Sequence, residues 1–412
     1  MPTNFLQMVR QFDRDLVLFM FASALVGFCL FGGIFSLLFN LYLLRLGYGP
    51  VFVGQVNAIG SLAFALASLP ASFIGSRFGN RRSMILGLFL AVIGHGLVCQ
   101  AGFISAPHRP LYILSTQSLA LLGISLYIVN GFPYLMDMAK PEQRTYVFSV
   151  QAALFPLAGF AGSLIGGFLP SYFSALLELP LDHPTPYSHT MLAASILLIA
   201  AVIALLNTRH IAKTVATETR QSAAPLPLRL IALFSCISLL YIASEGAVRT
   251  FFNVYLDTAL NIETSLIGVL TATGQFLAVP AALLMPYLVQ RFGNIRTFNG
   301  AVACAALTMI PLAFIAHWSI AGLCFMSTMA LSAIRRPAFT VFQQESIPPR
   351  WRTTMAGAVA ASSGFGYAAI AFGGGYIIEA VGYRSLFLGS AILSGFGILF
   401  FWVFFRNYSK AA

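Results

Sequence analysis

The chain has 412 residues, of which 58% are hydrophobic and 8% charged, and its formal net charge is +11. A soluble chain carries roughly a quarter charged residues, so this composition excludes soluble enzymes and soluble binding domains. Long uncharged runs such as Leu16–Leu44 and Thr145–Leu177 indicate a polytopic membrane protein. The five cysteines lie within apolar runs and lack metal-type spacing, so no metal site, disulfide framework or cofactor is expected.

Twelve membrane-spanning helices are predicted, because a helix needs about 20 apolar residues to cross the hydrocarbon core. Their approximate bounds are 16–44, 51–74, 83–104, 111–136, 145–170, 188–207, 229–256, 265–288, 297–316, 319–342, 353–378 and 385–405. The uncharged run Thr297–Ile334 is too long for one span and is divided at residues 317–319. The predicted fold class is an all-α polytopic membrane protein.

The basic residues predict the orientation of these spans. All but four of the 23 Lys and Arg fall at the side that holds both termini; Arg45, Arg109 and Arg384 lie at the other side, and Arg249 lies within a span. Lys and Arg accumulate in cytoplasmic loops, so both termini are expected in the cytoplasm. The protein is expected in the inner or plasma membrane of the cell. Because this pattern accounts for the positive charge, and no base-stacking motif accompanies it, nucleic acid is not expected as a partner.

Two segments of the sequence recur in the second half of the chain. Phe39–Leu43 recurs as Phe252–Leu256, and Arg77–Asn80 recurs as Arg291–Asn294. Each repeat holds an even number of spans, so the halves run in the same sense and are related by an axis along the membrane normal. We therefore expect two six-helix bundles, residues 1–206 and 229–412, joined by a cytoplasmic linker at 207–228, with one site between them.

The loops after the second and eighth spans carry a family resemblance. Ser72–Arg82 and Pro286–Arg296 resemble the Gly-x-x-x-Asp-Arg-x-Gly-Arg-Arg-Arg loop of the major facilitator superfamily of secondary transporters, with Ser76 and Gln290 at the acidic position. The resemblance covers essentially the whole chain and implies the major facilitator fold. It also implies a gate at the cytoplasmic side, where the alternative interpretation is a tight turn and membrane anchor. The candidate gate residues are Ser76, Arg77, Gly79, Arg81, Arg82, Asp137, Arg144, Arg291, Gly293, Glu345 and Arg352, and the pairs Asp137–Arg144 and Glu345–Arg352 are candidate substitutes for the missing acid.

Glycines in the fifth span resemble a motif of drug/proton antiporters in the same superfamily. Gly159, Gly162, Gly166 and Gly167 lie at the spacing of small residues that lets helices approach closely. Close packing is the preferred interpretation, and the resemblance favours export only weakly.

Ionisable residues within spans are costly and are functional candidates by default. Glu245 and Arg249 lie four residues apart in the seventh span, at the spacing of a salt bridge on one helix face. The pair is interpreted either as a self-neutralising structural contact or as a coupling carboxylate with a switchable partner or anion contact. Arg335 and Arg336 in the tenth span are interpreted either as membrane anchors or as an inward cationic site.

Neutral polar residues complete the set of candidate substrate contacts. By family resemblance, spans one, four, seven and ten line the cavity, and hydrogen bonding between helices is the alternative for each residue. The candidates are Asn40, Tyr42, Gln117, Asn130, Asn253 and Tyr255.

The predicted function is secondary transport of a small molecule by rocking of the two bundles, without enzymatic activity. No phosphate-binding GxxxxGK[ST] or catalytic constellation is present in the sequence. Efflux of an amphipathic or drug-like compound is the first expectation, because the site is sparsely polar, and proton coupling is left open. The alternatives are transport of an organic anion or lipid-like metabolite, and a membrane scaffold or sensor on the same fold. The expected partners are the small-molecule substrate and the lipid bilayer, with the chain as a monomer.

Overall fold

The computed structural model describes residues 12–140, 143–209, 227–348 and 351–405, and the side chains of residues 145, 352 and 353 lie outside this description. Most of the predicted linker 207–228 is also outside it. So are six basic residues counted for orientation, namely Arg10, Lys213, Arg220, Arg350, Arg406 and Lys410.

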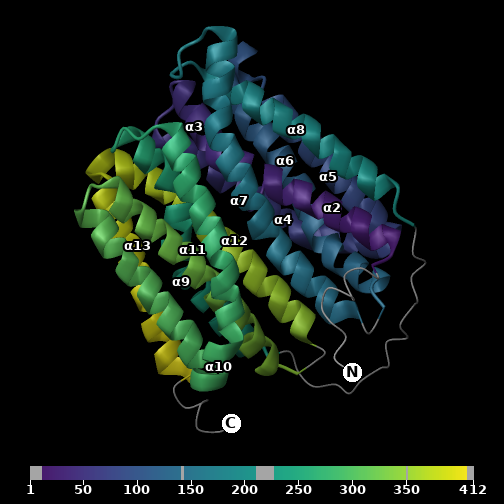
Figure 1. Cartoon of the computed structure of the whole chain (residues 1–412). Helices are drawn as coiled ribbons and strands as arrows, with labels where there is room; N and C mark the ends of the chain where they lie inside the picture. Colours follow the sequence, from purple (N-terminus) through teal and green to yellow (C-terminus); the bar gives the residue numbers. More distant parts are fainter. Residues whose placement is uncertain (1–11, 141–142, 210–226, 349–350, 406–412) are drawn as a thin grey trace.

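Helices make up nearly the whole described chain (Figure 1). They are α2 (Arg14–Cys29), α3 (Ile34–Arg45), α4 (Pro50–Phe78), α5 (Asn80–Val98), the short 3-10 helix η1 (Ala101–Phe103), α6 (Arg109–Met138), α7 (Arg144–Leu177), α8 (Pro184–Leu206), α9 (Leu228–Thr258), α10 (Thr264–Phe314), α11 (Trp318–Glu345), α12 (Arg352–Val381) and α13 (Tyr383–Phe405).

Each predicted span after the first corresponds to a helix or to part of one. The two spans predicted at 265–288 and 297–316 form the two arms of α10, which meet at Gly293, where the backbone turns to φ 79° and ψ 162°. A positive φ of this size suits glycine, which has no Cβ. Two bounds were predicted wrongly. The third span ends at Val98 because a turn and η1 follow it, and the fifth continues to Leu177 because Pro170 is accommodated inside α7.

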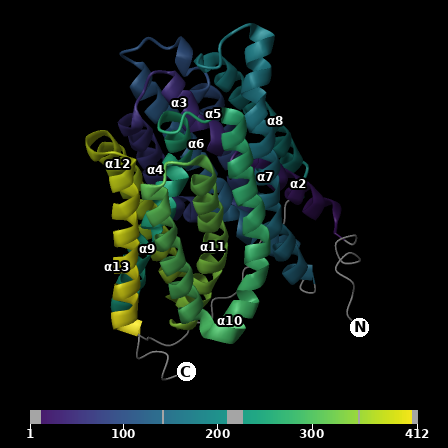
Figure 2. The same cartoon turned by 60° about the vertical axis from the view of Figure 1, so that its left-hand side comes forward.

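The helices before and after the predicted linker form two groups that lie side by side (Figures 1 and 2). The start of α2 and the end of α13 lie at one face of the molecule, here called the terminal face. The opposite face, here called the distal face, carries the loops at residues 46–49 and 259–263. The two groups meet chiefly where α4 packs on α12 and α7 packs on α10.

Close packing between the groups is found where small residues face one another near the distal face. A Cβ on Gly167 of α7 would lie 2.9 Å from the Cα of Gly268 in α10, and a Cβ on Gly375 of α12 would lie 2.7 Å from the carbonyl oxygen of Pro50 at the start of α4. Real Cβ atoms do not approach this closely, so the distal ends of the two groups touch backbone to backbone.

The first span is broken, whereas the sequence predicted one continuous helix over 16–44. Between α2 and α3 the chain adopts φ +76° at Gly32, whose N–H donates to Ser36 Oγ at 3.0 Å, while that hydroxyl donates to the Leu30 carbonyl at 2.6 Å. Ser163 of α7 donates to the Gly32 carbonyl. The break is possible because glycine permits the positive φ and because Gly159 of α7 leaves room for the Phe31 carbonyl.

Candidate functional site

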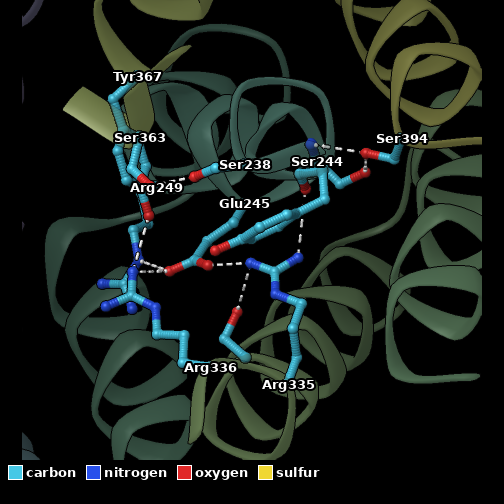
Figure 3. Close-up of polar contacts among 11 residues, drawn as sticks. Ser238, Ser244, Glu245, Arg249, Arg335, Arg336, Ser363, Tyr367 and Ser394 are labelled. Carbon is cyan, nitrogen blue, oxygen red and sulfur yellow. Dashed lines mark hydrogen bonds and ion pairs between the residues drawn. The ribbon is translucent and has the colours of Figure 1, made fainter. Parts of the chain in front are cut away.

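Four charged side chains from two helices meet in the interior of the second group (Figure 3). The Oε1 atom of Glu245 accepts hydrogen bonds from Arg249 Nε at 2.6 Å and from Arg336 Nη2 at 2.5 Å, and Oε2 accepts one from Arg335 Nη2. The predicted contact between Glu245 and Arg249 is therefore present. Both adjacent arginines of α11 reach the same carboxylate, because Glu245 of α9 lies between their two directions.

Burial divides this cluster into an inner and an outer part. The side chains of Glu245 and Arg335 are 0% and 1% exposed, whereas those of Arg249 and Arg336 are 39% and 51% exposed. Arg335 also donates to the Tyr241 carbonyl at 3.3 Å and stacks over the Tyr241 ring at 4.7 Å. Arg335 thus holds Glu245 in place, and the two outer guanidinium groups keep N–H groups for another partner.

Arg249 faces the first group of helices. Asn253 and Asp257, which lie four and eight residues after it on α9, both contact residues of that group. Residues at this spacing share one face of a helix. Arg249 therefore lies on the face of α9 that contacts the first group, about one helical turn from the contacts that close the distal face.

The charges of the cluster do not balance. Three arginines surround one carboxylate, which leaves two positive charges in excess. The excess lies on Arg249 and Arg336, which stay partly exposed to solvent and are therefore available to attract an anion. The cluster offers charge-assisted hydrogen-bond donors of the kind that bind carboxylates and phosphates.

Tyr367 of α12 belongs to the site and was not predicted. Its hydroxyl accepts from Arg336 Nη2 at 2.8 Å, and its own O–H has no acceptor among the described residues. Serine pairs brace α9 beside it: Ser238 with Ser363 and Ser244 with Ser394, each at 2.5 Å. The sequence held no signal specific to Tyr367, because its span carries other hydroxyl-bearing side chains such as Ser362, Ser363 and Tyr376.

Asn40 and Asn253 lie at the distal closure. Asn40 Nδ2 donates to the Thr250 carbonyl at 2.8 Å, and Asn253 Nδ2 donates to the Leu37 carbonyl at 3.1 Å, so each asparagine grips the backbone of the other group. The offset between the two sequence repeats relates Asn40 to Asn253, and it also relates the acceptor residue Leu37 to Thr250. We call these two hydrogen bonds the asparagine clasp. Because these side chains are 6% and 7% exposed, they are engaged between helices in this state.

A buried ion pair lies beside the asparagine clasp. Arg45 of α3 binds Asp257 of α9 through two hydrogen bonds, Nη1 to Oδ2 at 2.8 Å and Nη2 to Oδ1 at 2.6 Å. Arg45 also lies 5.3 Å over the ring of Tyr187, whose hydroxyl bonds Thr264 at 2.8 Å. This ion pair was not predicted, because Arg45 and Asp257 lie 212 positions apart and meet only through tertiary packing.

The other neutral candidates hold helices together within one group. Tyr42 donates to the Cys99 carbonyl at 3.3 Å, Asn130 Nδ2 donates to the Ala71 carbonyl at 3.1 Å, and the ring of Tyr255 packs against that of Tyr383 at 5.1 Å. Gln117 is buried, and its Oε1 has no partner among the described residues. None of these four contacts the charged cluster in the described part of the chain.

The predicted gate residues lie at the terminal face. Gly79 and Gly293 adopt positive φ, as expected for tight turns. The two related arginines, Arg77 and Arg291, lie over the rings of Phe78 and Phe292 at 5.7 and 5.5 Å.

Contacts at this face only partly match the predicted pairs. Ser76 Oγ donates to the Phe73 carbonyl at 2.8 Å, and Arg81 donates to Thr208 at 3.1 Å. Glu345 accepts from Asn294 at 3.3 Å, and its proposed partner Arg352 has no described side chain. Among the described side chains, Arg82, Asp137 and Arg144 form no ion pair, so the pair Asp137–Arg144 is not made in this state.

Comparison with known sequences finds one family whose model matches most of this chain. The model of the Major Facilitator Superfamily matches residues 19–371 and, again, residues 234–412. The glucose/galactose transporter of Brucella abortus biovar 1 (strain 9-941) is 23% identical over 291 residues, which cover 66% of this chain and 67% of that protein.

Solved structures resemble almost the whole chain. A D-xylose-proton symporter has a TM-score of 0.78 at 14% identity, with 94% of this chain and 97% of that chain covered. The nucleoside transporter NupG has a TM-score of 0.74 at 14% identity, with 95% and 99% covered. A bacterial homologue of the human lysosomal transporter Spinster, in an inward-facing and occupied conformation, has a TM-score of 0.72 at 14% identity, with 96% and 97% covered. At these identities the likeness is one of fold.

Proposed function

Because this chain belongs to the Major Facilitator Superfamily and is a secondary transporter rather than an enzyme, we propose that its substrate is a small organic anion. One observation carries the proposal: Arg249 and Arg336 present two partly exposed guanidinium groups anchored on a single carboxylate, and Arg249 lies on the face of α9 that contacts the first group. Bidentate guanidinium donors suit carboxylate and phosphate groups.

Efflux of a drug-like compound is less well supported than the sequence suggested. The first expectation rested on a sparsely polar site, whereas the cluster places four charged side chains and Tyr367 together. The curated relative is named for glucose and galactose transport. A neutral sugar is therefore the second candidate, because guanidinium and tyrosine hydroxyl groups also bind sugar hydroxyls.

Glu245 is better suited to holding the arginines than to carrying protons. Both of its oxygens are occupied by guanidinium donors, and its side chain is fully buried. A group that exchanges protons during transport must be reachable by water in at least one state. We therefore assign Glu245 as the anchor of the anion site.

The terminal face is proposed to be cytoplasmic. The excess of basic residues at that face favours this orientation under the positive-inside rule. Since the asparagine clasp and the Arg45–Asp257 pair hold the distal face together, the state described here is closed on the outer side in that orientation.

Flux measurements in proteoliposomes test the proposal. We would compare labelled glucose, gluconate and glucose 6-phosphate, which share a carbon skeleton and differ in charge. The charged probes should be transported, Arg249→Gln combined with Arg336→Gln should abolish that flux, and Arg14→Gln at the exposed start of α2 should leave it intact. Flux of glucose alone would favour the second candidate, and the absence of flux for every probe, with the same unlabelled probe inside the vesicles, would favour a scaffold. Repeating the assay with an imposed pH gradient decides whether protons are coupled.

A further inference from the structure

The two excess charges of the cluster have no counter-charge elsewhere in the protein's interior. The sequence contains 12 acidic residues, and of these Glu245 alone lies in the middle of a span. Asp257, at the distal end of α9, is already bound to Arg45. The first six spans therefore offer no carboxylate that could neutralise Arg249 and Arg336 when the halves close around the site.

The two outer guanidinium groups lie close to each other. Arg249 Nε and Arg336 Nη2 bond the same atom, Glu245 Oε1, at 2.6 and 2.5 Å. The remaining N–H groups of both arginines, apart from the Arg336 Nη2 bond to Tyr367, have no partner among the described residues. Because both guanidinium groups are held by the same Glu245 oxygen, their remaining N–H donors lie close together. They therefore suit a ligand that carries both negative charges on one group better than a long ligand with one charge at each end.

We propose that the substrate carries two negative charges on one compact group, as a phosphate monoester does, and that the protein works as an exchanger. The proposal rests on the anionic substrate proposed above and adds its valence and the mode of transport. A phosphate monoester carries about −1.5 to −2 charges at pH 7, which matches the excess of two at the cluster.

Exchange follows from the same balance of charge. With a dianion bound, the closed site is neutral, and the halves can occlude it and reopen at the other face. Without a dianion, occlusion would remove two unpaired guanidinium groups from water, which is costly in a low-dielectric interior. The loaded protein should therefore change its orientation much faster than the empty one.

The first experiment measures the mode of transport. Proteoliposomes preloaded with labelled glucose 6-phosphate are diluted into buffer with or without unlabelled glucose 6-phosphate. We expect efflux to be at least about a hundredfold faster with the external substrate, since each of the two excess charges adds a barrier worth a factor of about ten or more. Equal efflux in the two buffers would overturn the exchange mechanism.

The second experiment tests the valence, with binding measured by thermal stabilisation of the purified full-length protein. Wild type should bind glucose 6-phosphate more tightly than gluconate, and glucose most weakly. Arg249→Gln lowers the excess charge to one, so it should reverse the order of gluconate and glucose 6-phosphate, while Arg14→Gln should keep the wild-type order.

The outcomes separate this inference from the proposed function. If wild type binds gluconate and glucose 6-phosphate equally well, or if Arg249→Gln leaves their order unchanged, the anion site stands and the valence is wrong. If wild type binds neither charged probe, the proposed function fails and the inference fails with it.

Discussion

Removing the charge of Asp257 should open the distal face. The Arg45–Asp257 pair joins α3 to α9 through two short hydrogen bonds, and its side chains are only 17% and 10% exposed. Asp257→Asn leaves Arg45 without a counter-ion and weakens both bonds, which costs about 2 kcal/mol for hydrogen bonds to charged groups. Since every 1.4 kcal/mol is a factor of ten, the ratio of distal-open to distal-closed molecules should rise roughly 30-fold.

The assay is a distance distribution between two spin labels, one at Ala106 and one at Ala259, which are exposed on distal loops of the two groups. Asp257→Asn should add or enlarge a population at longer distance. Asp182→Asn is the matched control, because Asp182 lies 4.0 Å from Arg45 but is 97% exposed, and exposed ion pairs contribute less than about 1 kcal/mol. The reasoning is refuted if Asp257→Asn reproduces the wild-type distribution, or if Asp182→Asn shifts it as much.

Three further outcomes are expected from the same structure. Gly162→Ala should lower the thermal unfolding temperature, since a Cβ there would clash with the backbone of the break in the first span. Gly300→Ala is the control and should not lower it, because the space around Gly300 is open. Equal unfolding temperatures for the two variants would contradict this reasoning. Arg335→Gln should destabilise the protein by about 2 kcal/mol in a denaturation assay, because the buried Oε2 of Glu245 loses its charged hydrogen-bond donor, and a loss below about 0.5 kcal/mol would count against its anchoring role. Asn40→Ala and Asn253→Ala should each lower the free energy that favours the closed distal face by about 1 kcal/mol in the spin-label assay. A large effect from only one of them would mean that the two hydrogen bonds are not equivalent.

Much of the fold was predictable because hydropathy and charge act locally. Span lengths follow from the thickness of the bilayer, and the turns at Gly79 and Gly293 were marked by their related sequences. The break at Gly32 was not predicted, because a Gly-Gly pair inside an apolar run also occurs in continuous membrane helices. Its geometry depends on Ser163 and on the glycines of α7, which are distant in sequence.

The site was predictable only as far as single helices define it. The spacing of Glu245 and Arg249 indicated their contact, because both lie on α9. The meeting of α9 with Arg335 and Arg336 of α11 depends on tertiary packing, so two interpretations of the adjacent arginines remained open until the structure placed them on one carboxylate. Asn40 and its repeat partner were recognised as related, but the repeat alone does not say whether related residues bind substrate or each other's helices.

The asparagine clasp has the geometry of an isologous interface. In a symmetric dimer, residue i of one subunit contacts residue j of the other, and j contacts i in return. Asn40 with the Thr250 carbonyl and Asn253 with the Leu37 carbonyl are related in this way within one chain. Both acceptors belong to the main chain, so side-chain substitutions at positions 37 and 250 leave the acceptors in place, whereas the two donors admit few replacements. The chain therefore closes its distal face with one contact made twice, so that the loss of either asparagine leaves the related hydrogen bond in place.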